Sequence, residues 1–311
     1  MTVRIVTDSC ADLPPGIDKE LDITVVPAYV RFGERVCRDI VDISHDELYQ
    51  KLVESPIQPT TSQPSPGDFA HAYRRLAKET GEILSIQVTS KLSGTYNSAL
   101  QGRELVEGSC HIEIVDSLSA SMGLGLITMA AARLAKAGKD LSEIVEEVKQ
   151  SIPRMHLFAV FNTLKYILRG GRLGKAKALL GSMLNVKPLL TIRNGVIWPA
   201  GLARTRAKGI ERLVNVVKNS RNIQDVAIVH STTPDEAQSL KERIGTIFDR
   251  SQIYISRLGP ALGVHGGPGA LLLALREKVT SLGQEAEEGE QPKKRISLPS
   301  WHLPKLGFSR L

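Results

Sequence analysis

The feature of this sequence that most constrains its fold is the alternation of short apolar runs with longer stretches of helical periodicity. In the first half of the chain, strands are predicted at residues 3–7, 23–30, 82–88 and 111–115. Helices are predicted at residues 45–54, 68–80, 94–106, 118–137 and 142–151, and residues 58–66 are predicted to form a loop. Parallel strands need helical crossovers of about this length. The sequence therefore predicts an α/β fold built on a parallel sheet.

The second half of the chain continues the alternation after Pro153, which marks the predicted domain boundary. Strands are predicted at residues 156–161, 225–230 and 252–258, and helices at 164–168, 176–184, 205–218, 234–248 and 269–279. Residues 187–192 and 196–199 are predicted to pair as a hairpin, because Asn194-Gly195 is typical of a type I′ turn. We expect two α/β domains, residues 1–152 and 153–280, and a disordered tail at 281–311.

Composition narrows the classes of function. The formal net charge of +7 suits an acidic partner or an anionic membrane surface, but aromatic residues make up only 5% and no basic helix stands out, so nucleic acid is disfavoured. The three cysteines form no CxxC pair, and no metal site is expected. The N-terminal apolar run is too short for a signal peptide, and no stretch approaches the ~20 apolar residues of a membrane span. These features predict a cytoplasmic protein.

The portable signatures of catalysis are absent from this sequence. Gly174-Lys175 is followed by Ala176, and Arg169 occupies the position of the first glycine of a Walker A loop. Gly123 and Gly125 lack the third glycine of a dinucleotide-binding turn. The sequence contains neither a GxSxG elbow nor an HExxH motif.

Three polar segments remain as candidates for a binding site: residues 59–65, 90–99 and 263–269. In the second segment, free N–H groups at a helix start and neighbouring hydroxyls suit an anion, although Ser93 can equally be a simple helix cap. In the third segment, glycines bring the backbone close to a neighbour around His265, and this histidine can equally have a structural role.

These segments, in this order, resemble those of the DegV family, which includes the fatty-acid-binding subunits of bacterial fatty acid kinase. The resemblance covers about residues 3 to 279 and leaves out the tail. At residues 265–267 the chain has His-Gly-Gly where the family usually has His-Thr-Gly. The matching pieces are VTDS at 6–9, TSQPS at 61–65, LSGTYNS at 92–98, GGR at 170–172, KP at 187–188, RT at 204–205 and HGGPG at 265–269.

The resemblance implies two α/β domains with a lipid pocket between them. It implies that the fatty acid carboxylate is held by Thr61, Ser93 and His265, with Ser62 and Gly94 as a supporting polar shell. It further implies a separate kinase that phosphorylates this carboxylate, so the chain itself is expected to be no enzyme and to need no cofactor beyond its bound fatty acid. Three arginines are candidates to face the kinase or its phosphate: Arg169, Arg172 and Arg204.

Elementary energetics agree with a buried chain and a hydrogen-bonded headgroup. Removing the ~14 methylenes of palmitate from water is worth roughly 11 kcal/mol, more than any polar contact. Hydroxyls hold a carboxylate without neutralising it, which leaves an oxygen able to attack a phosphate. Residues 118–137 and 179–190 are candidate walls of the tunnel. Two other hypotheses are an acyl hydrolase that uses Ser93 and His265, and transient contact of the basic and apolar tail with a membrane surface.

Overall fold

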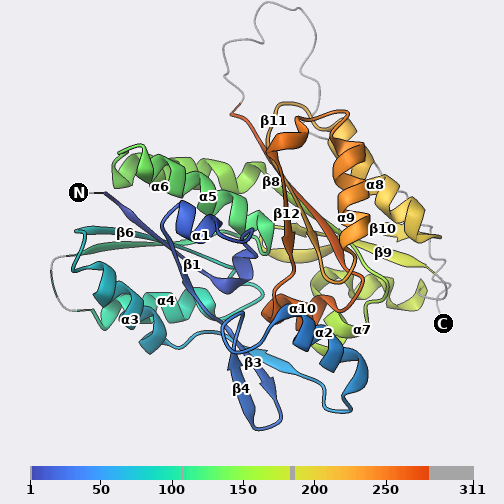
Figure 1. Ribbon diagram of the computed structural model, residues 1–311, viewed down its shortest axis with the longest axis horizontal. Coiled ribbons are helices and arrows are strands. Elements are labelled where there is room, and N and C mark those ends of the chain that lie inside the picture. The colour runs from blue at the N-terminus through green and yellow to red at the C-terminus, as the bar shows by residue number, and fades with distance from the viewer. Residues whose placement is uncertain (1, 107, 109, 183–185, 280–311) are drawn as a thin grey trace, which may run out of the picture.

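The computed structural model describes residues 2–106, 108, 110–182 and 186–279 (Figure 1). The predicted tail at 281–311 lies outside these residues. The first half of the chain contains β1 (Arg4–Asp8), η1 (Ser9–Ala11), α1 (Ile17–Glu20), β2 (Ile23–Val26), β3 (Tyr29–Phe32), β4 (Arg35–Arg38), α2 (His45–Glu54), β5 (Thr60–Ser62), α3 (Pro66–Leu76), β6 (Glu82–Gln87), α4 (Thr95–Glu104), β7 (His111–Asp116), α5 (Met122–Lys136) and α6 (Leu141–Ser151). The second half contains η2 (Ile152–Arg154), β8 (Met155–Val160), α7 (Lys165–Arg169), η3 (Gly174–Ser182), β9 (Lys187–Arg193), β10 (Val196–Ala203), α8 (Arg206–Asn219), β11 (Ile223–His230), α9 (Pro234–Ile244), η4 (Arg250–Gln252), β12 (Ile253–Arg257), α10 (Pro260–Gly266) and β13 (Leu271–Glu277).

The N-terminal sheet has the order β2-β1-β6-β7, and all of its pairings are parallel, as predicted. Neighbouring residues of a strand face opposite sides, so Ile83 packs with α3 and α4 while Leu84 packs with α5 and α6. Figure 1 shows these helix pairs on opposite faces of the sheet. Its strands carry apolar residues on both faces because both faces are covered.

The C-terminal sheet has the order β10-β9-β8-β13-β11-β12 and is mixed: β11 and β12 are parallel and the other pairings are antiparallel. One of its faces packs on α8 and α9 through a separate core cluster. Its other face packs on α5, which also contacts β1 and β6 of the N-terminal sheet. Helix α5 is apolar around most of its circumference because it lies between two sheets.

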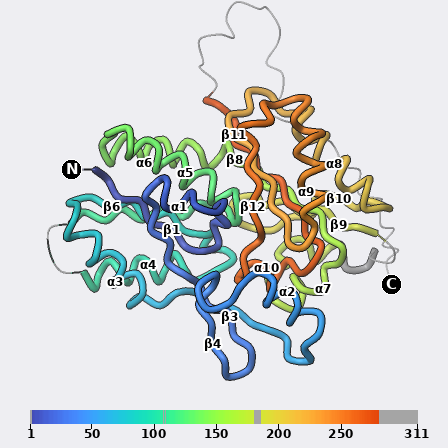
Figure 2. Tube along the Cα trace, in the orientation of Figure 1, coloured from blue at the N-terminus to red at the C-terminus, as the bar shows by residue number. Residues whose placement is uncertain are grey.

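A small third sheet, β4-β3-β5, packs with α2 and α10 around Val30, Cys37, Leu48 and Val264. The chain trace shows this layer below the other two sheets (Figure 2). It places β5, from the first half of the chain, beside α10, from the second half.

The structure corrects several predicted elements. Residues 269–279 form no helix: Leu271–Glu277 is β13, a strand inside the C-terminal sheet. The single strand predicted at 23–30 is two strands in different sheets, and the predicted loop at 58–66 contains β5. His265 lies on α10, a short helix that the sequence did not predict. The strands of the N-terminal sheet precede Pro153 and those of the C-terminal sheet follow it. One core cluster contains residues of both sheets, and the division of the chain into two domains stays a prediction.

Candidate functional site

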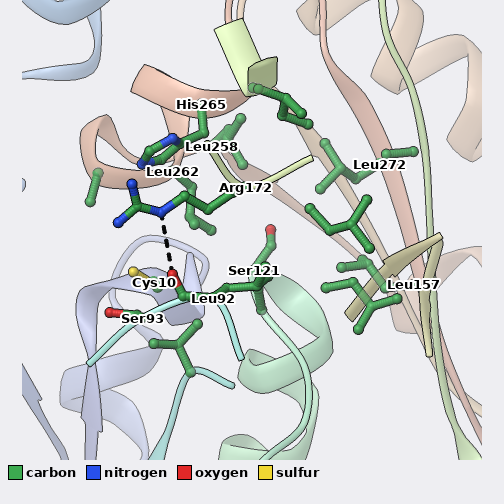
Figure 3. A pocket seen from close by; sticks show the side chains of 18 of the residues that line it. Cys10, Leu92, Ser93, Ser121, Leu157, Arg172, Leu258, Leu262, His265 and Leu272 are labelled. Carbon is green, nitrogen blue, oxygen red and sulfur yellow. Dashed lines mark hydrogen bonds between the residues drawn. The ribbon is translucent and has the colours of Figure 1, made fainter. Parts of the chain in front are cut away.

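A cavity lies between the N-terminal and C-terminal sheets and is lined by residues from both halves of the chain (Figure 3). The volume of the cavity is about 140 Å³. The side chains that line the cavity include Cys10, Thr61, Ser62, Gln63, Leu92, Ser93, Ser121, Leu157, Phe161, Arg172, Leu190, Thr191, Leu258, Leu262, His265 and Leu272.

Thr61 and His265 meet at one end of this cavity although 204 residues separate them in sequence. Thr61 is held on β5, where it pairs with Val30 of β3. His265 is held near the C-terminal end of α10. Thr61 Oγ1 and His265 Nε2 are 2.8 Å apart, which is a hydrogen bond. The sequence therefore identified two side chains that the fold brings into contact.

The imidazole of His265 is partly buried and lies near the Arg172 guanidinium. Burial, and to a lesser extent the Arg172 guanidinium, lowers the pKa of His265 to about 4, so the ring is neutral at neutral pH. Its Nδ1 atom is buried without a hydrogen-bond partner among the described residues. A β-carbon on Gly170 would collide with the ring, so glycine there makes room for the imidazole.

Ser93 lines the same cavity at the junction between β6 and α4. Its hydroxyl oxygen is 2.8 Å from Thr95 Oγ1 and accepts a longer bond of 3.3 Å from the Thr95 backbone N–H. The N-cap residue of α4 is Gly94, which has no side chain to cap the helix. Ser93 thus supports the helix start and still lines the cavity. The two interpretations from the sequence, a helix cap and part of a binding site, are therefore compatible.

Of the predicted supporting residues, Ser62 lines the cavity and Gly94 does not. A β-carbon on Gly94 would lie 2.8 Å from the amide nitrogen of Gln63, which does line the cavity. Gly94 therefore contributes by leaving room for Gln63, a residue that the sequence gave no reason to single out beyond its place in the polar segment.

The three predicted arginines have different positions. Arg172 lies at the cavity, where its guanidinium donates to the Gly170 carbonyl at 2.6 Å and more weakly to the Leu92 carbonyl at 3.4 Å (Figure 3). Arg169 is exposed and donates to Gln58 Oε1 at 2.9 Å. Arg204 is exposed just before α8 and is not among the described residues that line the cavity. Of the three arginines, only Arg172 lines the cavity.

The rest of the cavity wall is mainly apolar. Leu157 on β8 and Leu272 on β13 lie at the side away from His265 (Figure 3). The predicted wall at residues 118–137 contributes Ala120 and Ser121, which precede α5, and the predicted wall at 179–190 contributes Leu190. The side chains of α5 itself pack instead into the surrounding core.

Three buried carboxylates that sequence reasoning did not assign lie beside the cavity. Burial raises the pKa of Asp8 to about 6, that of Asp12 to about 8 and that of Asp39 to about 7, although hydrogen bonds to each lower it in part. Asp8 is the last residue of β1, Asp12 follows η1, and Asp39 follows the edge strand β4.

The arrangement offers hydrogen-bond donors to an anion rather than a nucleophile paired with a base. The hydroxyl of Ser93 contacts Thr95, and Nε2 of His265 contacts Thr61, so Ser93 and His265 form no hydrogen-bonded pair in this structure. The acyl hydrolase hypothesis is therefore disfavoured.

Comparison with known proteins places the chain in a family. The model of the DegV family, described as uncharacterised, matches residues 2–278. A DegV domain-containing protein of Caldanaerobacter subterraneus is 33% identical over 89% of this chain and 99% of the relative. One from Streptomyces coelicolor is 36% identical over 86% of this chain and 96% of the relative. The chain belongs to the DegV family.

Solved structures of relatives share the fold. A DegV family protein from Thermus thermophilus, described by its fatty acid binding, has a TM-score of 0.83 and 33% identity over 89% of this chain and 100% of that one. DegV of Bacillus subtilis, described as a fatty acid binding protein, has a TM-score of 0.81 and 30% identity over 89% of this chain and 100% of that one. A stearic-acid-binding protein from Eubacterium ventriosum has a TM-score of 0.80 and 27% identity over 88% of this chain and 98% of that one.

Within the described residues, none of the helices is both long and apolar enough to cross a bilayer.

Proposed function

We propose that this protein binds a long-chain fatty acid such as palmitate, with the acyl chain in the cavity and the carboxylate at Thr61, Ser93 and His265. The observation that carries the proposal is a mainly apolar cavity with hydroxyls and an imidazole at one end. Burial of the methylenes supplies most of the affinity, and the polar end fixes the orientation of the ligand. The solved relatives that are described as fatty acid binding proteins support this assignment.

The contact between Thr61 and His265 suggests how the carboxylate is held. Thr61 has a single hydroxyl proton, so it donates to a ligand only when His265 donates from Nε2 to the threonine oxygen. A neutral imidazole protonated at Nε2 fits the lowered pKa of His265 and leaves the unpartnered Nδ1 unprotonated. In this arrangement the imidazole donates to the Thr61 hydroxyl and that hydroxyl donates to the carboxylate. Ser93 donates a second hydrogen bond to the ligand.

We further propose that the bound carboxylate is presented to a separate kinase, and that this chain does not itself transfer phosphate. Arg172 lies at the polar end of the cavity, where its guanidinium can meet the phosphate of an acyl phosphate. Exposed Arg169 and Arg204 are the proposed contacts to the kinase. Contact of the tail with a membrane surface, proposed from the sequence, concerns residues outside those described.

The ligand that co-purifies with the protein tests the first proposal. Native mass spectrometry of protein from a bacterial host is expected to show one bound acyl chain, and delipidated protein is expected to take up one palmitate. An apo mass together with no uptake of added palmitate would remove fatty acid binding from consideration. ATP added to the loaded protein alone is expected to give no acyl phosphate, and addition of a fatty acid kinase catalytic subunit is expected to give it.

A further inference from the structure

Two carboxylates that the proposed fatty-acid site does not use meet the start of α10. The residues Asp12 and Asp39 are 6% and 0% exposed. Asp12 Oδ1 accepts the Gly259 N–H at 2.8 Å, and Asp39 Oδ1 accepts the Ala261 N–H at 3.1 Å. The Ser121 hydroxyl donates to the other oxygen of Asp12 at 2.6 Å. Residues from the first half of the chain thus supply the acceptors that this buried helix start needs.

Helix α10 is also a wall of the cavity. Its residues Ala261, Leu262, His265 and Gly266 all line the cavity. The helix has only seven residues, so His265 lies about one turn from the N–H groups that the carboxylates hold. A short helix has little stability of its own, and its position is set by the contacts at its ends.

We propose that Asp12 and Asp39 are positioning residues that hold the first turn of α10 and thereby place His265 against Thr61 for the fatty-acid carboxylate. The proposal rests on the proposed function and deepens it. Neither aspartate contacts His265 through a hydrogen bond found in the structure; each acts through the helix backbone. Without an acceptor, the Ala261 N–H would be buried and unpaired, and the helix start would move toward water or another partner.

The role requires an acceptor oxygen more than a negative charge. An asparagine at position 39 keeps an oxygen that can accept the Ala261 N–H, whereas an alanine does not. Asp39→Asn is therefore expected to preserve most of the placement of His265 that Asp39→Ala loses. If Asp39 only stabilised the fold, the palmitate affinity of Asp39→Asn would not be expected to exceed that of Asp39→Ala.

The test is a double-mutant cycle between Asp39→Ala and His265→Ala with palmitate affinity as the measurement. Asp39→Ala alone is expected to weaken palmitate binding about tenfold, and Asp39→Asn much less. In the His265→Ala background, Asp39→Ala is expected to cause no further loss. Asp225→Ala is the matched control, because Asp225 is a partly buried acid that pairs with Arg276 and does not line the cavity. It is expected to lower stability and leave palmitate affinity unchanged.

A second readout is the NMR signal of the His265 imidazole in protein with ¹⁵N-labelled histidine. In Asp39→Ala the signal is expected to shift toward its position in Thr61→Ala, and in Asp225→Ala it is expected to stay. If Asp39→Ala does not fold, Asp12→Ala replaces it in the double-mutant cycle with His265→Ala. Additive losses in the cycle, or an unmoved His265 signal, would overturn the positioning role while wild-type palmitate binding persists. Failure of the wild-type protein to bind palmitate would overturn the proposed function instead.

Discussion

At the scale of single residues, Thr61 connects the two parts of the proposed headgroup site because its hydroxyl serves His265 and the ligand at once. Thr61→Val removes the hydroxyl and keeps the shape of the side chain. It is expected to weaken palmitate binding by about 1–2 kcal/mol, because a hydrogen bond is lost and its partner is left unpaired. Isothermal titration with palmitate measures the change. Thr191→Val is the matched control, because Thr191 lines the same cavity from β9. Equal losses in both variants would remove Thr61 from the headgroup site.

Gly170 affects the same site through space rather than chemistry. Gly170→Ala adds a methyl group that would collide with the His265 ring. The variant is expected to weaken palmitate binding and to lower stability by about 1–3 kcal/mol. Gly81→Ala is the control, because a β-carbon there meets no atom within 4 Å. Calorimetry and denaturant titration of both variants check the prediction; an effect of similar size in Gly81→Ala would contradict it.

At the scale of elements, the sequence predicted most helices and strands but failed where local preference and tertiary context disagree. Residues 271–277 read LLLALRE, and Leu and Ala favour helix. As β13 they are covered on both faces, so they show no alternation that would indicate a strand. Helix α10 was missed because it lies among glycines, which usually mark turns. In both cases the neighbours of the segment decide its structure.

Helix α2 packs against α10 and contacts the chain just before it. The Tyr49 hydroxyl donates to the Leu258 carbonyl, just before α10, at 2.9 Å. Tyr49→Phe is expected to lower the free energy of unfolding by about 1–2 kcal/mol, because a buried carbonyl loses its donor. Tyr96→Phe is the control, because Tyr96 is partly buried and its hydroxyl makes no hydrogen bond among the described residues. Denaturant titration of both variants gives the comparison, and similar losses would argue against the Tyr49 contact.

At the scale of the whole molecule, the candidate site depends on contacts between distant parts of the chain. Motifs in the sequence identified Thr61, Ser93, Arg172 and His265, which all line one cavity. The sequence could not identify Asp39, since an isolated aspartate after an edge strand is ordinary and its partner Ala261 lies 222 residues away. Motifs in the sequence therefore predicted side chains that line the cavity, and only the fold revealed the hydrogen bonds at the start of α10.

The buried carboxylates also give the whole molecule a pH dependence. The pKa values of Asp8, Asp12 and Asp39 are raised from 3.8 to about 6, 8 and 7 by burial. Above pH ~4 the unfolded chain releases these protons while the folded protein retains them. The folded state therefore binds more protons, and the free energy of unfolding falls as pH rises toward about 8. The pKa of His265 is lowered from 6.5 to about 4, so this residue makes the free energy of unfolding rise with pH. This opposite effect is confined to pH values below about 6.5.

Between pH ~6.5 and ~8, the pH dependence of the free energy of unfolding therefore reflects the three carboxylates and not His265. The free energy of unfolding is expected to fall there by about 2 kcal/mol, and Asp12→Asn is expected to remove a large part of that slope because Asp12 has the highest of the three pKa values. Asp42→Asn is the control, since hydrogen bonds from Arg38 lower the pKa of this exposed carboxyl to about 2, far from the window. Urea titrations at several pH values measure the slopes. A stability that stays level or rises across this window in the wild-type protein would mean that the three carboxylates are already ionised in the folded state, and that α10 is held by charged rather than neutral acceptors.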